Sequence, residues 1–289
     1  MKKIYKILVI FVFLCLSLGG KDDARVMVIY YFDVGQADCI FITLPNGDNM
    51  LIDSGNNADG SRVVNFLSTL GVRKINHFII THPHEDHMGG ADNILNCLNV
   101  EKLYSPYIHS EDIPTTLCYK EYLFTAKQKA LDINTVSVGD VLIEHGDLRV
   151  LCLSPFLRNY DELNEYSAVI RIDYFEKSFL FMADAEKRNE EDLLQNKLLL
   201  KCDVLKIGHH GSRTSSCEKF LKTAAPEYAI ISVGGKNDFG HPDEAVLKRL
   251  DSLNCKTYRT DLCKTVVAVC DGINIKIHTT NICLDGDSA

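Results

Sequence analysis

The chain has 289 residues, a formal net charge of -8 at neutral pH, 46% hydrophobic residues and 24% charged residues. These values are typical of a globular protein and exclude a disordered, collagen-like or low-complexity chain. The length allows one large domain or two small ones, and the acidic balance argues against a protein that coats nucleic acid through bulk positive charge.

The first twenty residues are typical of a secretory signal peptide. Three lysines within residues 1–6 precede an apolar stretch over 7–18, and small residues follow up to Gly20. The order of these regions matches a cleaved signal, and the stretch is shorter than the ~20 apolar residues of a spanning helix. We predict a signal peptide over 1–20, or an N-terminal anchor if it is not cleaved, and one domain over 21–289. The domain is expected to be secreted or extracytoplasmic, with no stable membrane span and a charge of -11 once the three lysines are removed.

Eleven cysteines leave the redox state open. Ten remain after removal of the predicted signal, and an even number is compatible with disulfides in an exported protein. However, Cys39, Cys152 and Cys270 lie in or beside apolar stretches, where a free thiol packs as a small hydrophobe. Buried free thiols and disulfides therefore both stay open, with Cys255, Cys263 and Cys270 as the best candidates for a bridge.

The first half of the domain alternates strands with helices. Apolar stretches rich in β-branched and aromatic residues predict strands over 26–32, 39–44, 49–52, 75–80 and 102–104. The second and third strands are joined by the turn Pro45-Asn46-Gly47-Asp48, which suits a tight hairpin. Helices are expected in the segment that Ser61 caps and Gly71 closes, and over 91–98 and 116–131.

The second half repeats this alternation. Strands are predicted over 135–138, 141–144, 148–153, 168–174, 178–182, 204–207, 228–233, near Thr257, and over 265–269 and 273–277. Helices are predicted over 186–196, 218–225 and 242–250, the last with Pro242 near its first turn. Strand-rich halves punctuated by helices predict an α+β fold in which two sheets pack face to face with helices outside.

A dense group of metal-binding residue types follows the strand predicted over 75–80. His82, His84, Asp86 and His87 form the pattern HxHxDH, and imidazole and carboxylate are the ligands that suit Zn²⁺ and related cations. Because the proline inside the pattern disfavours a helix, the site is expected in a loop at the end of the strand. The glycine pair that follows is expected to let the backbone turn into the next helix.

These motifs resemble those of the metallo-β-lactamase superfamily, whose HxHxDH also follows a buried strand and a segment like Leu51-Ile52-Asp53-Ser54-Gly55. The similarity is closer to the metallo-β-lactamase domain of ComEC-type competence proteins. It is carried by FDVGQAD at 32–38, ADAE at 183–186, LKIGHHGS at 205–212 and GHP at 240–242. The resemblance runs from about Val28 to Ile277 and implies a single-domain, four-layer αββα sandwich with a two-metal site at one edge of the sheets. Because competence proteins take up transforming DNA, it also implies a role in degrading the strand that is not transported.

The resemblance implies a ligand set residue by residue. His82 and His84 match the ligands of the first metal, and Asp86 and His87 match those of the second. Asp184 matches the carboxylate that bridges both. The implied cofactors are two divalent metal ions, Zn²⁺ or Mn²⁺.

Asp184 and the last ligand have alternatives. Asp184 follows an apolar strand and could instead cap the helix over 186–196. The last ligand is expected from His209 or His210. Because neighbours on an extended chain point in opposite directions, only one of these two histidines is expected to bind metal.

Three further residues match segments near the site. Asp53 matches a position that orients ligands through hydrogen bonds, with an Asx-turn before Ser54 as the alternative. Asn164 and Ser167 match a segment in which many superfamily members have a third histidine for the first metal, and here no histidine is present. The coordination of the first metal is therefore left open, to be completed by water or to bind weakly.

Asp86 and His241 are the predicted catalytic residues. A loop histidine before a helix can protonate a leaving alkoxide or contact a phosphate oxygen, although His241 could instead cap the chain beside Pro242. Ser212 and Arg213 belong to a segment of hydroxyls, backbone amides and a cation that suits phosphate oxygens, with an ordinary polar loop as the alternative.

The remaining charged residues and histidines receive simpler expectations. Lys206 and Lys236 join Arg213 as local positive charges for a phosphate. The histidines away from these motifs are expected at the surface, namely His77, His109, His145 and His278.

The predicted function is a secreted metal-dependent phosphodiesterase or nuclease that uses metal-activated water on DNA or another phosphodiester. One alternative is a metallo-hydrolase of a carbonyl substrate such as a β-lactam or lactone, and a second is a non-catalytic binding module of the same fold. The sequence does not separate nucleic acid from a small phosphodiester, and it leaves the oligomeric state open.

Overall fold

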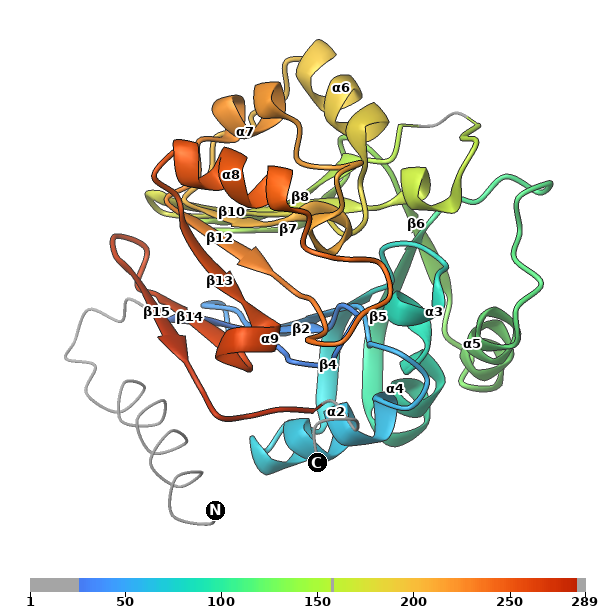
Figure 1. Cartoon of the computed structure of the whole chain (residues 1–289). Coiled ribbons are helices and arrows are strands. Elements are labelled where there is room, and N and C mark those ends of the chain that lie inside the picture. Colours follow the sequence, from blue (N-terminus) through green and yellow to red (C-terminus); the bar gives the residue numbers. More distant parts are fainter. Residues whose placement is uncertain (1–25, 157–158, 285–289) are drawn as a thin grey trace.

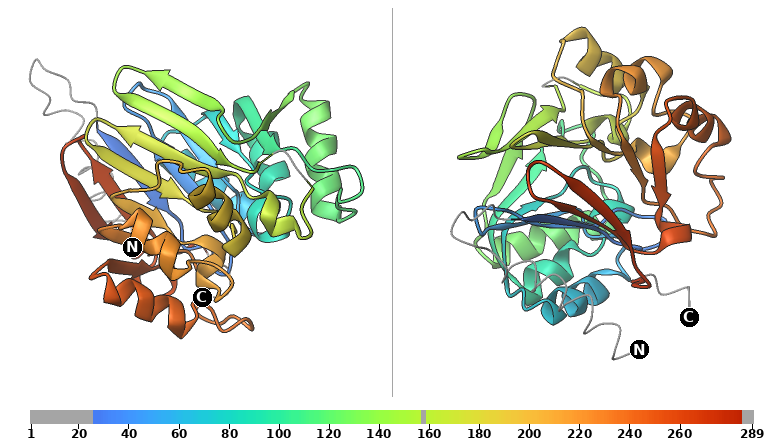
Figure 2. Two further views of the ribbon diagram at one scale, coloured as in Figure 1. Left: turned by 90° about the horizontal axis from the view of Figure 1, so that it is seen from above. Right: turned by 90° about the vertical axis from the view of Figure 1, so that its left-hand side faces the viewer.

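The computed structural model describes residues 26–156 and 159–284, so the predicted signal peptide lies outside the described residues. The described strands form two sheets that pack face to face, and helices cover the outer face of each sheet (Figures 1 and 2). This arrangement confirms the predicted α+β sandwich of four layers.

The first sheet has eight strands in the order β15-β14-β1-β2-β3-β4-β5-β6. Their bounds are β1 (Met27–Tyr31), β2 (Ile40–Thr43), β3 (Asn49–Ile52), β4 (Lys74–Ile79), β5 (Asn99–Pro106), β6 (Ile133–Val136), β14 (Val266–Cys270) and β15 (Ile275–Thr279). Strands β3 to β6 pair in parallel, because a helical crossover joins each strand to the next.

The second sheet has seven strands in the order β13-β12-β11-β10-β9-β8-β7. Their bounds are β7 (Val141–His145), β8 (Leu148–Ser154), β9 (Val169–Tyr174), β10 (Lys177–Phe181), β11 (Val204–Lys206), β12 (Tyr228–Ile231) and β13 (Lys256–Arg259). Strands β10 to β13 pair in parallel. The carboxyl ends of the parallel strands of both sheets are where ligand sites form in such sheets.

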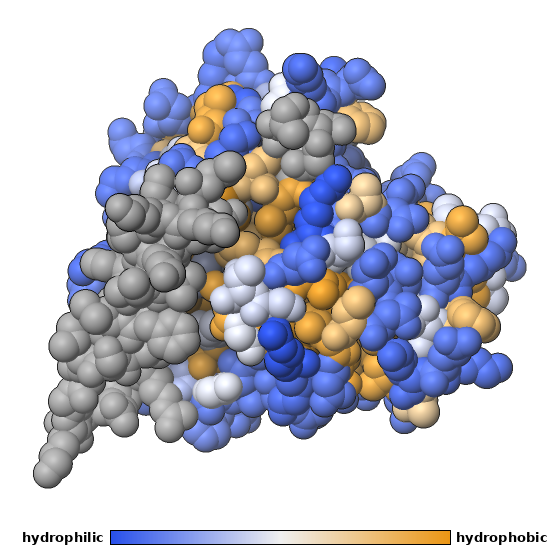
Figure 3. All heavy atoms as spheres, turned by 90° about the horizontal axis from the view of Figure 1, so that it is seen from below, coloured by the Kyte–Doolittle hydropathy of each residue, from blue (hydrophilic) through white to orange (hydrophobic). Residues whose placement is uncertain are grey.

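Each sheet carries its own helical layer (Figure 1). The helices over the first sheet are α2 (Gly60–Thr69), α4 (Ala91–Cys97) and α5 (Leu117–Gln128), and those over the second are α6 (Lys187–Gln195), α7 (Glu218–Ala224) and α8 (Glu244–Ser252). Short turns lie at the sheet edges, namely α3 (Glu85–Met88), α9 (Thr260–Cys263), η1 (Leu163–Tyr166) and η2 (Gly208–Gly211). Seen from below, the α2 and α4 side is mostly polar toward its rim, with apolar side chains showing near its centre (Figure 3).

The alternation of side chains along β1 explains why the layers stack as they do. Val28 and Tyr30 pack against the helices of the first layer, whereas Met27, Ile29 and Tyr31 pack against the second sheet. Successive residues of a strand point to opposite faces. A strand that is apolar on both faces therefore has to lie between two covering layers.

Two helix starts differ from their predictions. Helix α2 begins at Gly60 with Asp59 at its N-cap position, not at Ser61. Helix α8 begins at Glu244, after Pro242, because the Asp243 carboxylate accepts the Ala245 N–H at 2.8 Å and caps the helix there. Both helices lie where the apolar periodicity placed them.

The ten cysteines of the described residues are all free thiols, which agrees with one of the two readings that the sequence left open. Burial raises the pKa of Cys152 and of Cys202 to about 12, so both thiols stay protonated and unreactive. The surface expectation for His77 is wrong. Its imidazole is buried in β4, stacks on Tyr104 at a ring separation of 5.9 Å and lies 3.2 Å from the Tyr104 hydroxyl.

Gly90 is needed for close packing rather than for backbone freedom. Gly89 and Gly90 both have ordinary negative φ values, -56° and -84°, so the predicted reason for the pair is wrong. A Cβ on Gly90 would lie 2.5 Å from the Ser54 carbonyl oxygen and 2.7 Å from the Cα of Gly60. The glycine thus lets the loop that carries HxHxDH press against the segment after β3.

Gly90→Ala is therefore expected to destabilise the fold. Overpacking of this kind costs about 1–3 kcal/mol, which lowers the Tm of a domain of this size by about 2–12 °C. Thermal unfolding followed by circular dichroism measures the change. Gly235→Ala is the matched control, because the nearest atom to its added Cβ is 3.7 Å away, and an equal loss of Tm in both variants would contradict the packing argument.

Candidate metal centre

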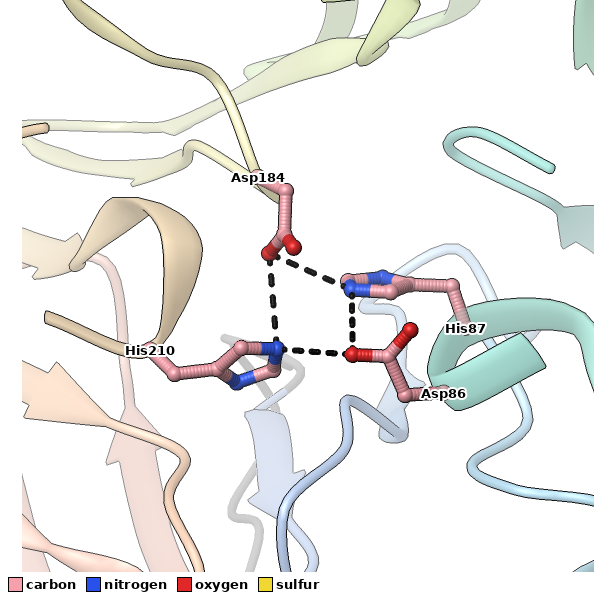
Figure 4. Close-up of side chains that lie close together, drawn as sticks. All are labelled: Asp86, His87, Asp184 and His210. Carbon is pink, nitrogen blue, oxygen red and sulfur yellow. Dashed lines mark hydrogen bonds and ion pairs between the residues drawn. The ribbon is translucent and has the colours of Figure 1, made fainter. Parts of the chain in front are cut away.

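Loops at one edge of the two sheets bring histidines and carboxylates together. The HxHxDH segment follows β4 of the first sheet, whereas Asp184 follows β10 and His210 follows β11 of the second sheet. Figure 4 shows Asp86, His87, Asp184 and His210 pointing toward a common centre. The parallel strands thus place residues that are far apart in sequence at one edge.

These four residues form a compact cluster. His87 Nε2 lies 3.2 Å from one oxygen of Asp184 (Oδ1), and His210 Nε2 lies 3.5 Å from the same oxygen. Asp86 Oδ2 lies 3.1 Å from His210 Nε2 and 3.8 Å from His87 Nε2. One potential ligand atom from each residue therefore lies within 4.8 Å of all the others, a spacing that suits a single cation.

Hydrogen bonds turn the histidine rings toward this centre. His87 donates its Nδ1–H to Asp53 at 2.8 Å, and His210 donates its Nδ1–H to the Ser232 carbonyl at 2.9 Å. In its neutral form each ring therefore presents the lone pair of Nε2 to the cluster, as in many metal-binding histidines. Asp53 also accepts the Thr81 N–H at 2.8 Å, so its carboxylate joins the two loops instead of capping the turn at Ser54.

A second group faces the other oxygen of Asp184, Oδ2. His82 Nε2 lies 3.9 Å from this oxygen and 3.1 Å from His84 Nδ1. His209 Nε2 lies 3.8 Å from it. Asp184 is therefore placed between two sets of nitrogens, in the position of the predicted bridging carboxylate.

Buried polar atoms of the cluster that lack hydrogen-bond partners indicate that it can hold a metal ion. His87 Nε2 and Asp184 Oδ1 are buried, and outside the ion pairs of the cluster neither atom has a hydrogen-bond partner. Buried polar atoms without a partner are rare and call for an explanation such as an ion. A divalent cation among imidazole and carboxylate ligands satisfies both atoms.

Electrostatics point the same way. Burial opposes ionisation of His87, but the carboxylates of Asp184, Asp53 and Asp86 outweigh it and raise the pKa of His87 well above its usual value. Burial likewise opposes the charge on Asp184, yet the surrounding histidines hold its pKa well below its usual value. The buried carboxylates thus favour the protonated, positively charged form of His87. A bound cation would supply this positive charge in its place.

Two expectations about backbone geometry are wrong. Glu186, not Asp184, occupies the N-cap position of α6, and its N–H donates to Asn189 Oδ1 at 3.2 Å. His209 and His210 are not on an extended chain, because they have φ values of 46° and 51° in the turn η2. Their rings therefore do not point in opposite directions.

The predicted phosphate segment is mostly turned inward. Ser212 is buried, and its hydroxyl lies 2.9 Å from that of Thr214. Ser215 is also buried and donates to the Gly208 carbonyl at 2.7 Å. Arg213 remains exposed, so it is the cation of this loop that a substrate can reach.

Lys206 is not a surface cation. It is fully buried on β11, and its Nζ lies 2.7 Å from Asp38 Oδ2 in a salt bridge between the two sheets. Lys236 is exposed and lines an open groove of about 900 Å³ that also contains Asp86, Gln36 and Phe239. Asp86 is the residue of the metal cluster that lines this groove, so a molecule in the groove lies beside one edge of the cluster.

His241 lies beside Gln36 and Phe239, two residues that line this groove, and Gln36 sets the tautomer of its neutral ring. Gln36 Oε1 accepts the Gly234 N–H at 3.1 Å, which fixes the amide so that Gln36 Nε2 faces His241 Nδ1 at 3.4 Å. The amide therefore donates to Nδ1, and the proton of neutral His241 is on Nε2. Burial and the neighbouring His209 lower the pKa of His241.

Sequence reasoning missed three residues that the structure connects to the site. Gln36 contacts His241, Glu186 contacts His209, and Asp38 pairs with Lys206. Gln36 and Asp38 lie in the FDVGQAD segment and Glu186 in ADAE, so the motifs contained them. Their partners are distant in sequence, and no local pattern indicates the contacts.

The chain matches the profile of the metallo-beta-lactamase superfamily over residues 32–235. It belongs to this superfamily. It is 30% identical over 269 residues to ComE operon protein 3 of Bacillus subtilis (strain 168), which covers 87% of this chain and 33% of that protein. It is 28% identical over 244 residues to competence protein ComA of Neisseria gonorrhoeae, which covers 84% of this chain and 32% of that protein.

These similarities confirm the predicted resemblance to ComEC-type metallo-β-lactamase domains, and the chain spans about a third of the length of these two relatives. Among solved structures, CmlA, a diiron β-hydroxylase from Streptomyces venezuelae, superposes with a TM-score of 0.58 at 16% identity over 94% of this chain and 59% of that chain. This similarity shows the shared fold. Within the described ranges, every helix is too short or too polar to cross a bilayer.

Proposed function

We propose that this superfamily member is a divalent-metal-dependent phosphodiesterase that acts on DNA outside the cytoplasm. The observation that carries the proposal is the position of Asp184, which presents one oxygen to each of two groups of nitrogens. That arrangement suits two cations that share a carboxylate. The similarity to competence proteins supports DNA as the substrate, and the signal peptide predicted over 1–20 supports export.

The chain's own residues have distinct roles in this proposal. Two divalent cations, when bound, lower the pKa of water and neutralise charge on a phosphodiester during in-line attack. Asp86, His87 and His210 would bind one cation, and Asp184 would bind both cations through its two oxygens. His241, when it is protonated on both nitrogens, is placed to give a proton to the leaving oxygen and become neutral, and Gln36 holds its ring in position.

A substrate panel tests the proposal. Single- and double-stranded DNA, RNA, a chromogenic diester and a β-lactam are incubated with the purified domain, with and without a chelator. We expect cleavage of DNA and of the diester, loss of both activities with chelator and recovery with Mn²⁺ or Zn²⁺. Cleavage of the β-lactam alone would contradict the proposal, and N-terminal sequencing of the exported protein checks for a start near residue 21.

His241→Ala is expected to slow cleavage of DNA much more than cleavage of a nitrophenyl diester. General acid catalysis contributes about 10²–10⁴-fold, and a nitrophenolate leaves without protonation whereas an alkoxide does not. Steady-state kcat on both substrates measures the difference. His145→Ala, an exposed residue of β7, is the control. An equal loss on both substrates would show that His241 binds phosphate and does not act as the acid.

A further inference from the structure

The group formed by His82, His84 and Asp184 receives no imidazole from the segment around Asn164. Residues 164–167 are Asn-Glu-Tyr-Ser and supply no imidazole. His82 Nε2 lies 3.1 Å from His84 Nδ1 and 3.9 Å from Asp184 Oδ2. Two imidazoles and one carboxylate oxygen make three protein ligands, so a fourth position is available to a further side chain or to water.

His209 faces this gap because of its unusual backbone. His209 and His210 both have positive φ, a conformation that costs free energy in residues other than glycine and persists where the surroundings impose it. The His209 N–H donates to the Ala183 carbonyl at 2.9 Å, and its own carbonyl accepts the Ser212 N–H. The turn directs both rings toward Asp184, and their centroids lie 6.2 Å apart.

The two rings meet different oxygens of the same carboxylate. His210 Nε2 lies 3.5 Å from Asp184 Oδ1, and His209 Nε2 lies 3.8 Å from Asp184 Oδ2. Ligand atoms that share a cation at about 2.0–2.2 Å lie within about 4.4 Å of one another. The 3.8 Å separation is compatible with His209 and Asp184 sharing a cation. His82 Nε2 lies 3.9 Å from the same Asp184 oxygen.

A carboxylate sets the tautomer of His209. His209 Nδ1 lies 2.8 Å from Glu186 Oε1, and Glu186 is held at the N-cap position of α6. Because the carboxylate accepts the Nδ1–H, the lone pair is on Nε2, the atom that faces Asp184. Asp53 accepts the Nδ1–H of His87, and the Ser232 carbonyl accepts that of His210. Such acceptors are typical partners of metal-binding histidines.

Asn164 is the competing candidate. Its Oδ1 is buried without a hydrogen-bond partner. Its Nδ2 lies 3.3 Å from Glu186 Oε1 and 3.5 Å from His209 Nε2. The shorter contact supports Asn164 as a residue that holds Glu186 in place, which leaves His209 Nε2 for the cation.

We propose that His209, oriented by Glu186, is the third histidine ligand of the first cation, so that two successive histidines serve different cations. This inference rests on the two-metal centre of the proposed function. Residues 164–167 contain no histidine, and His209, which lies 45 positions after Asn164, would supply the imidazole in their place.

Metal stoichiometry tests the inference without using activity. The chelated domain is dialysed against a series of Mn²⁺ concentrations, and bound metal per chain is measured by elemental analysis, with circular dichroism to verify folding. Wild type is expected to bind two ions, and both His209→Ala and His209→Gln are expected to bind one in the same range. Glu186→Gln is expected to keep two, with the weaker ion bound about 10–100-fold less tightly. Asn164→Ala is expected to keep two, with the weaker ion bound no less tightly than in Glu186→Gln, because Asn164 acts only through Glu186. The exposed control His145→Ala is expected to keep two at wild-type affinity.

The outcomes separate the two proposals. Fewer than two ions on wild type would contradict the proposed function. Two ions on wild type and two at unchanged affinity on folded His209→Ala and His209→Gln would overturn the inference and leave the function standing. Loss of one ion in Asn164→Ala with retention in both His209 variants would assign the ligand to Asn164 and also overturn it. If His209→Ala fails to fold, His209→Gln, which keeps a polar side chain of similar reach, decides the question.

Discussion

Asp184→Ala is expected to lower kcat/KM for phosphodiester cleavage by at least about 10³-fold. Asp184 contacts the Nε2 atoms of both groups, because Oδ1 faces His87 at 3.2 Å and Oδ2 faces His82 at 3.9 Å. Charge stabilisation by cations is worth several kcal/mol in the transition state, and about 4 kcal/mol corresponds to about 10³-fold in rate. Initial rates on single-stranded DNA and on a chromogenic diester measure the loss.

The controls for this variant separate chemistry from folding. Asp184→Asn keeps the size and one oxygen but removes the charge, so it is also expected to lose most activity. Asp251→Ala changes an exposed carboxylate in α8 and is expected to match wild type. Wild-type activity in Asp184→Ala would contradict the role of Asp184 as a carboxylate shared by two cations.

Lys206→Met is expected to cost about 3–5 kcal/mol of folding free energy. Lys206 and Asp38 are both buried and lie 2.7 Å apart, so removal of the lysine leaves a carboxylate without its charge partner. The pair joins β11 of one sheet to the loop before β2 of the other, beside His210, whose Nδ1 lies 3.6 Å from Asp38 Oδ1. At about 2–4 °C per kcal/mol, the Tm is expected to fall by about 6–20 °C.

A double variant gives this prediction its sharpest form. Replacing a whole buried ion pair with apolar residues is often neutral, whereas breaking it is not, so Asp38→Leu together with Lys206→Met is expected to recover most of the lost Tm. Lys222→Met is the surface control, because its pair with Glu218 is exposed and such pairs contribute about 0–1 kcal/mol. Equal Tm changes in Lys206→Met and Lys222→Met would contradict the account.

The sequence predicted the four layers because the information is local. Strand β1 alternates between two apolar faces, and the apolar stripes of the helices lie at helical spacing. The HxHxDH segment was predicted for the same reason, since its four potential ligands lie within six residues. Asp184 was predicted from the resemblance of its ADAE segment, and its place shortly after an apolar strand supported that prediction.

What the sequence could not predict depends on distant partners or on rare backbone angles. The sequence gives no sign that Lys206 is buried, because its partner Asp38 lies far away in sequence, in the loop before β2 of the other sheet. Two successive histidines with positive φ are not predictable from residue type, because the conformation is imposed by contacts such as the one from His209 N–H to Ala183. The error about His209 and His210 followed from assuming an extended chain.

Anomalous diffraction from crystals grown with Mn²⁺ or Zn²⁺ tests the central claim most directly. Two peaks about 3.5–4 Å apart are expected, one on each side of the Asp184 carboxylate. His87 and His210 are expected to contact one peak, and His82 the other. A single peak, or two peaks that do not share Asp184, would contradict the two-metal centre on which the proposed function rests.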